Sequence, residues 1–132
     1  MLVLQPSQFT VNEAWIVFRI NDVPIETDAD GAFNCMALMD AASCFILGSE
    51  FVPLNADELS ELEIYRLLKQ GQNHKNQLPK TLYVPVEQSA DLIIAIATRQ
   101  GIHVVVVPES ELNVFIGEAR DDFRERFGRS EA

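Results

Sequence analysis

The sequence lacks most of the features by which a protein reveals its chemistry. Only two of its 132 residues are cysteines and two are histidines, and none stands in a CxxC or HxxxH pair, which argues against a zinc site. It contains no glycine-rich phosphate loop and no Gly-x-Ser-x-Gly elbow, so the usual nucleotide-binding and hydrolase motifs are missing too. Cys35 and Cys44 each stand in an apolar, strand-like run, and we interpret both as small side chains of a reduced core.

Long apolar runs are also missing. No stretch approaches the ~20 residues of a membrane-spanning helix, and the segment 1–6 has neither the basic nor the apolar region of a signal peptide. We therefore expect a cytoplasmic protein with no membrane contacts. With 132 residues, 48% of them hydrophobic, the chain is long enough for one buried core. We predict a single domain over 1–132, in which 1–13 is compatible with an extended arm and 14–127 forms the core.

Positive charge is scarce. The chain has 10 lysines and arginines against 20 aspartates and glutamates, a net charge of −10. Because phosphate backbones are bound by clustered basic residues, unassisted binding of nucleic acid is disfavoured, and a protein partner or self-association is expected instead. The polar loop 72–80 is the exception, because it carries His74, Lys75 and Lys80 and no acid. It is the expected contact point for an anionic partner, although an ordinary crossover loop explains it equally well.

Patterns of β-forming residues predict five strands. The expected ranges are 15–20, 32–39, 44–51, 81–86 and 102–107. The first strand is expected to restart after Pro24, because proline cannot donate to a sheet ladder, and the segment 28–31 has the composition of a tight turn. The run 102–107 is apolar at nearly every position, which predicts a strand buried on both faces.

Apolar residues at helical spacing predict three helices. The expected ranges are 55–70 or 57–70, 90–100 and 109–127. The first should bury Leu62 together with Ile64 or Tyr65 and stop at Gly71, and Ser89 should cap the second. The complete order is βββαβαβα. Three antiparallel strands followed by two crossover units predict an α/β protein, a mixed sheet with helices on both faces.

Short stretches of the sequence resemble the retroviral-type integrase and transposase catalytic cores, which have the ribonuclease H-like fold. Those cores carry an Asp-x-Thr-like stretch, a glycine-led second strand, an Asp-x-x-Ser turn, and a characteristic segment leading into their second catalytic strand. The matching stretches here are Asp22–Ile25, Gly31, Met39–Ser43, Ile46–Gly48 and Leu78–Val84. The resemblance spans about residues 14 to 125 and implies a ribonuclease H-like fold.

The resemblance also implies where catalysis would need carboxylates. In such cores two Mg²⁺ or Mn²⁺ ions ~4 Å apart are held by hard oxygen ligands. The acids stand on the first strand, at the end of the fourth and on the final helix. The nearest matches are Asp22, Glu87 and Glu118, of which Asp22 and Glu118 would be the metal ligands.

Each match departs from the family pattern in its own way. Asp22 follows the apolar run of its strand, and Glu87 is displaced, so that Pro85 or Val86 holds the equivalent place. Glu118 is the best placed, although an acid on so acidic a helix more often faces solvent.

Two main hypotheses follow. In the first, the chain is a non-catalytic ribonuclease H-like domain that needs no cofactor and acts through protein contacts, including contacts with itself. In the second, it is a Mg²⁺- or Mn²⁺-dependent nuclease or phosphodiesterase that uses Asp22, Glu87 and Glu118. A third rests on charge alone, an acidic accessory protein that occupies a basic surface of its partner.

Overall fold

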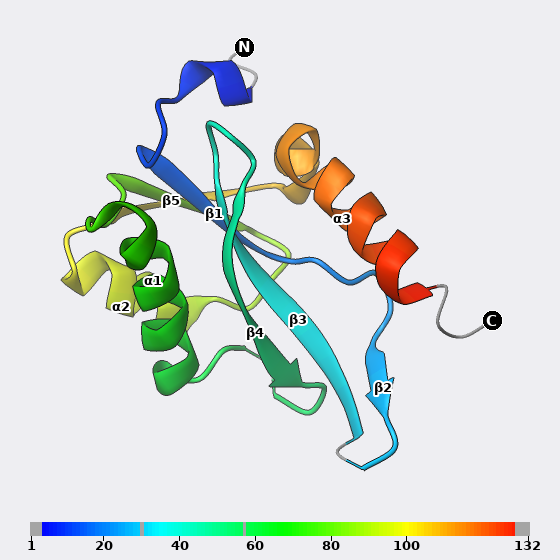
Figure 1. The fold of residues 1–132 in the computed structure, drawn as a ribbon. Coiled ribbons are helices and arrows are strands. Elements are labelled where there is room, and N and C mark those ends of the chain that lie inside the picture. The colour runs from blue at the N-terminus through cyan, green and yellow to red at the C-terminus, as the bar shows by residue number, and fades with distance from the viewer. Residues whose placement is uncertain (1–3, 30, 57, 129–132) are drawn as a thin grey trace.

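The computed structural model describes residues 4–29, 31–56 and 58–128 (Figure 1). Its strands are β1 (Ala14–Arg19), β2 (Ile25–Thr27), β3 (Gly31–Asp40), β4 (Ile46–Pro53), β5 (Thr81–Pro85) and β6 (His103–Val107). Its helices are α1 (Glu61–Lys75), α2 (Asp91–Arg99) and α3 (Asn113–Gly128), with short 3-10 turns at Pro6–Gln8 and Glu109–Leu112. None of the helices in these ranges is both long and apolar enough to cross a bilayer.

A mixed six-stranded sheet forms the centre of the molecule. The long strand β3 pairs antiparallel with β1 and β2 and with β4, while β1, β5 and β6 are parallel neighbours. The strand β2 follows Pro24, as predicted from the restart of the first strand. The order of elements confirms the predicted α/β arrangement, with β2 as a short addition.

The sheet carries a core on each face. One core lies between the sheet and the helices α1 and α2, and the other lies beneath α3 (Figure 1). Strand β1 serves both, because Trp15 and Val17 point into the first core while Ile16 and Phe18 point into the second. All four are buried, which explains why this strand is apolar at consecutive positions rather than alternating.

Helix α1 begins and ends later than its sequence predicts. Ser60 caps it in a reciprocal pair with Glu63, which satisfies free N–H groups of the first turn. Gly71, the predicted stop, is buried inside the helix, and Asn76 ends it in the left-handed conformation instead. A Cβ at Gly71 would lie 2.7 Å from Cη2 of Trp15, so this glycine lets the helix approach the sheet.

The stripe prediction was wrong at Leu62, which is 63% exposed. Of the alternatives Ile64 and Tyr65, Ile64 is fully buried and Tyr65 is 40% exposed. Ala90 rather than Ser89 is the N-cap residue of α2, and no side chain caps that helix. The last predicted helix is divided, since a 3-10 turn follows Pro108 and α3 begins at Asn113.

Cys44 belongs to the turn before β4 and not to the strand itself. It has a φ of 59°, a left-handed conformation that is unusual for a residue with a Cβ. The buried carboxylate of Asp40 holds this turn, since it accepts hydrogen bonds from the backbone N–H and the hydroxyl of Ser43 and from the N–H of Asn12.

Strand β6 is not buried on both faces as predicted. It is the edge strand next to β5, and its side chains are partly or largely exposed, with Val106 at 46%.

Residues 4–13, which the sequence allowed to be an extended arm, contain a 3-10 turn, and Phe9 packs edge-on against Tyr83 with ring centroids 5.9 Å apart. The prediction of a single domain over 1–132 remains a prediction.

Candidate functional site

The parallel strands β1 and β5 pair only over their first residues. Their last paired residues are Ile16 and Tyr83, and beyond them the two strands separate. The carboxyl ends of parallel strands at such a point are where open α/β sheets generally bind ligands. On the α1 and α2 side, a cleft of about 310 Å³ opens here, with Val17 and Val84 on its floor and Arg19, Glu87 and Glu109 among its polar lining residues.

The opposite face of the same point is closed by apolar groups. Phe18 and Pro85 stand two residues beyond the last pair, and strand alternation puts them on the face of Ile16 and Tyr83, beneath α3. Both are buried. The guanidinium of Arg120, from α3, lies 5.9 Å from the centroid of the Phe18 ring, within the range of a cation–π contact.

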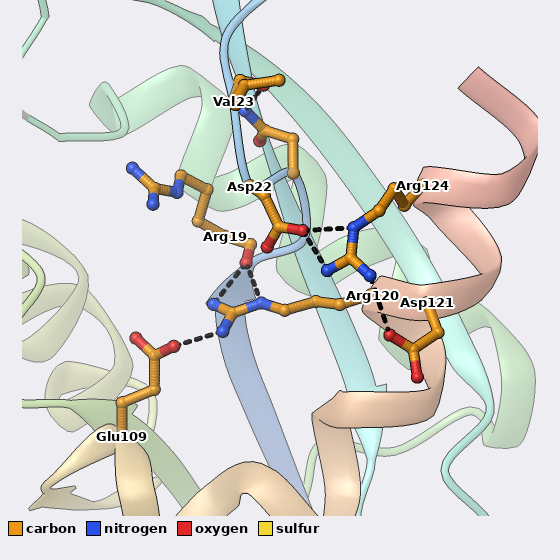
Figure 2. A network of polar contacts seen from close by, with 8 residues as sticks. Arg19, Asp22, Val23, Glu109, Arg120, Asp121 and Arg124 are labelled. Atoms are coloured by element: carbon orange, nitrogen blue, oxygen red, sulfur yellow. Dashed lines mark hydrogen bonds and ion pairs between the residues drawn. The ribbon is translucent and has the colours of Figure 1, made fainter. Parts of the chain in front are cut away.

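Arg120 is held from two directions (Figure 2). Its Nε and Nη2 donate to the backbone oxygen of Arg19 at 3.0 and 2.7 Å, and its Nη1 is paired with the carboxylate of Glu109. The side chains of Arg120 and Glu109 are only 16% and 27% exposed. This ion pair, with its carbonyl contact, ties α3 to the end of β1 and to the 3-10 turn before the helix.

Asp22, the first predicted carboxylate, is occupied by a second arginine of α3. Nε of Arg124 donates to Oδ2 of Asp22 at 2.7 Å, Nη2 bonds to the same oxygen, and Nη1 donates to Asp121 at 3.1 Å (Figure 2). The hydrogen bond to Asp22, followed by its charge, raises the pKa of Arg124. The Arg124 and Asp22 side chains are 59% and 40% exposed, so this is a surface clasp.

Glu87, the second predicted carboxylate, has a structural partner. Its Oε1 accepts a hydrogen bond of 2.9 Å from the backbone N–H of Glu109, the first residue of the 3-10 turn. A carboxylate at that place complements the free N–H groups of a helical turn. Glu87 lines the cleft, whereas Asp22 and Glu118 do not.

Glu118, the third predicted carboxylate, lies along a different groove. It is exposed on α3, and with Asp122 and Arg126 it lines a hollow that is closed on the other side by Ser43 and Cys44. Burial, followed by the charges of Asp40 and Glu118, raises the pKa of the Cys44 thiol. A thiol whose pKa is raised remains protonated at neutral pH, so Cys44 is not an activated nucleophile.

Retroviral integrase cores are structurally similar to this chain. The catalytic core domain of BIV integrase in crystal form I has a TM-score of 0.57 at 11% identity, covering 91% of this chain and 72% of that chain. A chain of the simian T-cell lymphotropic virus intasome, in complex with the PP2A regulatory subunit B56 gamma, has a TM-score of 0.60 at 10% identity. The fold is ribonuclease H-like.

At such identities the likeness concerns the ribonuclease H-like fold alone. The match to the intasome covers 87% of this chain but only 39% of that chain. No known protein family and no curated protein sequence matches the chain. The fold predicted from the sequence, and its resemblance to integrase cores, are confirmed.

The residues present do not fit the metal pair that the resemblance implies. That chemistry needs acids on the first strand, at the end of the next parallel strand and on the last helix, close enough to share two ions. β1 and β5 contain no acid, and α3 brings Arg120 to the meeting point. Within residues 4–29, 31–56 and 58–128, no three His, Cys, Asp or Glu side chains are grouped so that they could hold a metal ion. A catalytic role for Asp22, Glu87 and Glu118 remains a prediction that activity measurements must test.

Sequence reasoning missed Arg120 and Glu109, the two residues that occupy the centre of the candidate site. The only signal available was the spacing of Arg120 and Arg124, four apart and therefore on one face of a helix. Because acids surround this pair in the sequence, nothing there distinguishes it from a solvated surface. Arg120 contacts Arg19 of β1, and Arg124 contacts Asp22 in the segment after it, so the partners lie 101 and 102 positions apart, a relation that no local pattern encodes.

Proposed function

We propose that this chain is a non-catalytic ribonuclease H-like domain of the cytoplasm, and that it works through contacts with protein. One observation carries the proposal, the place of Arg120 over Phe18. At the point where the fold would gather metal-binding carboxylates, this chain has a guanidinium, a phenyl ring and Pro85.

Electrostatics supports this interpretation. A divalent cation is stabilised by carboxylate and carbonyl oxygens, and a fixed positive charge in the same place repels it. Glu109 forms an ion pair with that guanidinium, so its charge is already matched by Arg120. Neither Phe18 nor Pro85 has a side-chain oxygen to offer.

The contacts of Arg120 also indicate a structural role for the residues at this point. Charge-assisted hydrogen bonds are stronger than neutral ones, and those of Arg120 are largely shielded from water. They fasten α3 to the sheet. The net charge of −10 supports a protein partner over nucleic acid, whose phosphates would be repelled.

Nuclease assays on the full chain test this proposal. Single- and double-stranded DNA and RNA are incubated with the protein in Mg²⁺, in Mn²⁺ and in EDTA, beside Glu118→Gln, a variant of the best-placed predicted carboxylate. We expect no metal-dependent cleavage by either protein. Cleavage that requires the metal and is lost in Glu118→Gln would overturn the proposal and favour the nuclease or phosphodiesterase that uses Asp22, Glu87 and Glu118.

A further inference from the structure

The sheet ends at three strands, of which β2 is only three residues long, and the two longer edge strands, β4 and β6, differ in how their outer sides are covered. Along β4, side chains of α1 occupy the outer backbone groups. Gln70 accepts a hydrogen bond from the N–H of Ser49 at 3.0 Å and donates to its carbonyl oxygen at 3.4 Å, and His74 Nε2 lies 3.1 Å from the carbonyl oxygen of Leu47. Arg66 and Glu50 add an ion pair over the same edge. This edge is therefore covered and charged, which are two of the means by which proteins prevent strand addition.

The β6 edge has neither protection. The N–H of His103 donates to Lys80 and the carbonyl oxygen of Val107 accepts from Val86, so the odd-numbered residues bond to β5. In a strand the backbone groups of alternate residues point to opposite sides, so Val104 and Val106 direct their N–H and C=O groups outward. The part of the chain that the structure describes gives these groups no hydrogen-bond partner.

The composition of β6 also leaves it open. Between His103 and Val107 there is no lysine, acid or proline, and no bulge interrupts its register with β5. Four consecutive valines form a strand of high β-propensity whose side chains are only partly covered. An exposed, straight, apolar edge of this kind is a template for pairing with another strand.

The charges around β6 favour a particular partner. At its amino end stand exposed basic residues, Lys80 and Arg99. At its carboxyl end stand exposed acids, Glu87, Asp91 and Glu111. A twofold axis through the middle of the strand sets each basic end beside the acidic end of the other copy, whereas a parallel arrangement would set like charges together.

We propose that β6 is the interface through which two copies of this chain associate, by antiparallel pairing about a twofold axis at Val105. Val104 then exchanges both backbone hydrogen bonds with Val106 of the second copy, and the two sheets become one continuous sheet. Helix α2 packs beside β6 and carries Asp91 and Arg99 at its opposite ends, so the same axis pairs the ends of the two helices. This inference deepens the proposed function, because it names the partner as a second copy.

Sedimentation equilibrium on the full chain tests the pairing. The wild type is expected to be a dimer at micromolar concentrations. Val106→Lys puts a charge on the open edge, and Val104→Pro removes an outward N–H without touching a bond to β5. Both are expected to be monomeric with a circular dichroism spectrum like that of the wild type, although Val104→Pro, which removes a side chain packed against the core, is expected to unfold more easily. Val23→Lys is the matched control, since Val23 is 67% exposed and lies outside β6, and it should remain dimeric. A monomeric wild type, or a dimer that survives both edge variants, would overturn the proposal.

A charge exchange tests the orientation. Arg99→Glu and Asp91→Arg, at the helix ends that the axis pairs, should each weaken the dimer severalfold, and the double variant should recover most of that loss, because the new pair has the same complementarity in reverse. Two single variants without effect, or a double variant no tighter than either single one, would contradict the twofold arrangement. A monomer without nuclease activity would refute only this inference, whereas metal-dependent cleavage would refute the proposed function whatever the oligomeric state.

Discussion

Asp40 shows how one buried carboxylate can organise a turn far from any catalytic role. Its side chain is 2% exposed and accepts hydrogen bonds from Asn12 and Ser43, while Asn12 accepts one from the indole N–H of Trp15. The network joins the segment before β1 to the turn after β3, and it holds Cys44 in its left-handed conformation. Asp40 and Ser43 lie in the stretch Met39–Ser43, one of those in which the sequence resembles integrase cores.

Replacing Asp40 with alanine should therefore be costly. Three donors lose their acceptor, two of them backbone N–H groups that cannot turn elsewhere, and we expect a loss of about 2–4 kcal/mol in the free energy of unfolding. Urea denaturation measures the loss. Asp28→Ala, in an exposed turn, is the control and should change stability by less than about 0.5 kcal/mol. Equal effects of the two substitutions would show that the network contributes nothing.

At the scale of elements, Gly71 decides how closely α1 lies on the sheet. In an exposed helix interior, glycine to alanine usually stabilises by about 1 kcal/mol. At Gly71 the added Cβ would meet Trp15 and Leu38 at 2.7 and 2.8 Å, so we expect Gly71→Ala to destabilise by about 1–3 kcal/mol. Gly117→Ala in α3, where a Cβ meets nothing within 4 Å, should instead be neutral or stabilising. Thermal unfolding of both variants compares them, and a stabilising Gly71→Ala would contradict the packing described for α1.

The attachment of α3 should depend on Arg120 far more than on Arg124. Arg120 is mostly buried with Glu109, and its removal leaves that acid unpaired, so Arg120→Ala should lose about 2–3 kcal/mol. Arg124 is solvent-exposed and its bonds to Asp22 and Asp121 are open to water and salt, so Arg124→Ala should have a much smaller effect. Chemical denaturation at low and high salt measures the loss of unfolding free energy for each variant. A larger loss for Arg124→Ala than for Arg120→Ala would contradict the attachment of α3 through Arg120.

Most of the helices and strands could be predicted from the sequence, because hydrophobic periodicity and turn residues are local signals. The strands of the first meander, the crossover order and the interruption at Pro24 all follow from them. The end of α1 could not be predicted, because Gly71 serves contact with Trp15 rather than termination. The exposure of β6 was also hidden, since a run of valines is the same whether a strand lies inside a sheet or at its edge. The position of Arg120 in the candidate site could not be predicted either, because it depends on contacts between α3 and β1, which no local pattern reveals.

At the scale of the whole molecule, the fold is ribonuclease H-like, and Arg120, Phe18 and Pro85 lie where such a fold would be expected to gather catalytic carboxylates. The predicted acids each have another task or place. Asp22 clasps α3 through Arg124, Glu87 caps a turn, and Glu118 lines a separate groove. We propose that the fold serves as a scaffold and that the open edge at β6 lets two copies associate.

We propose that this fold does not bind the catalytic metals, and calorimetric titration of the full chain with Mn²⁺ tests this most directly. A working site would bind Mn²⁺ with a Kd of about 1 mM or lower, and the bound metal would raise the melting temperature of the protein by mass action. We predict no saturable binding, and a titration indistinguishable from that of Glu118→Gln. Saturable binding by the wild type that disappears in Glu118→Gln would contradict the account.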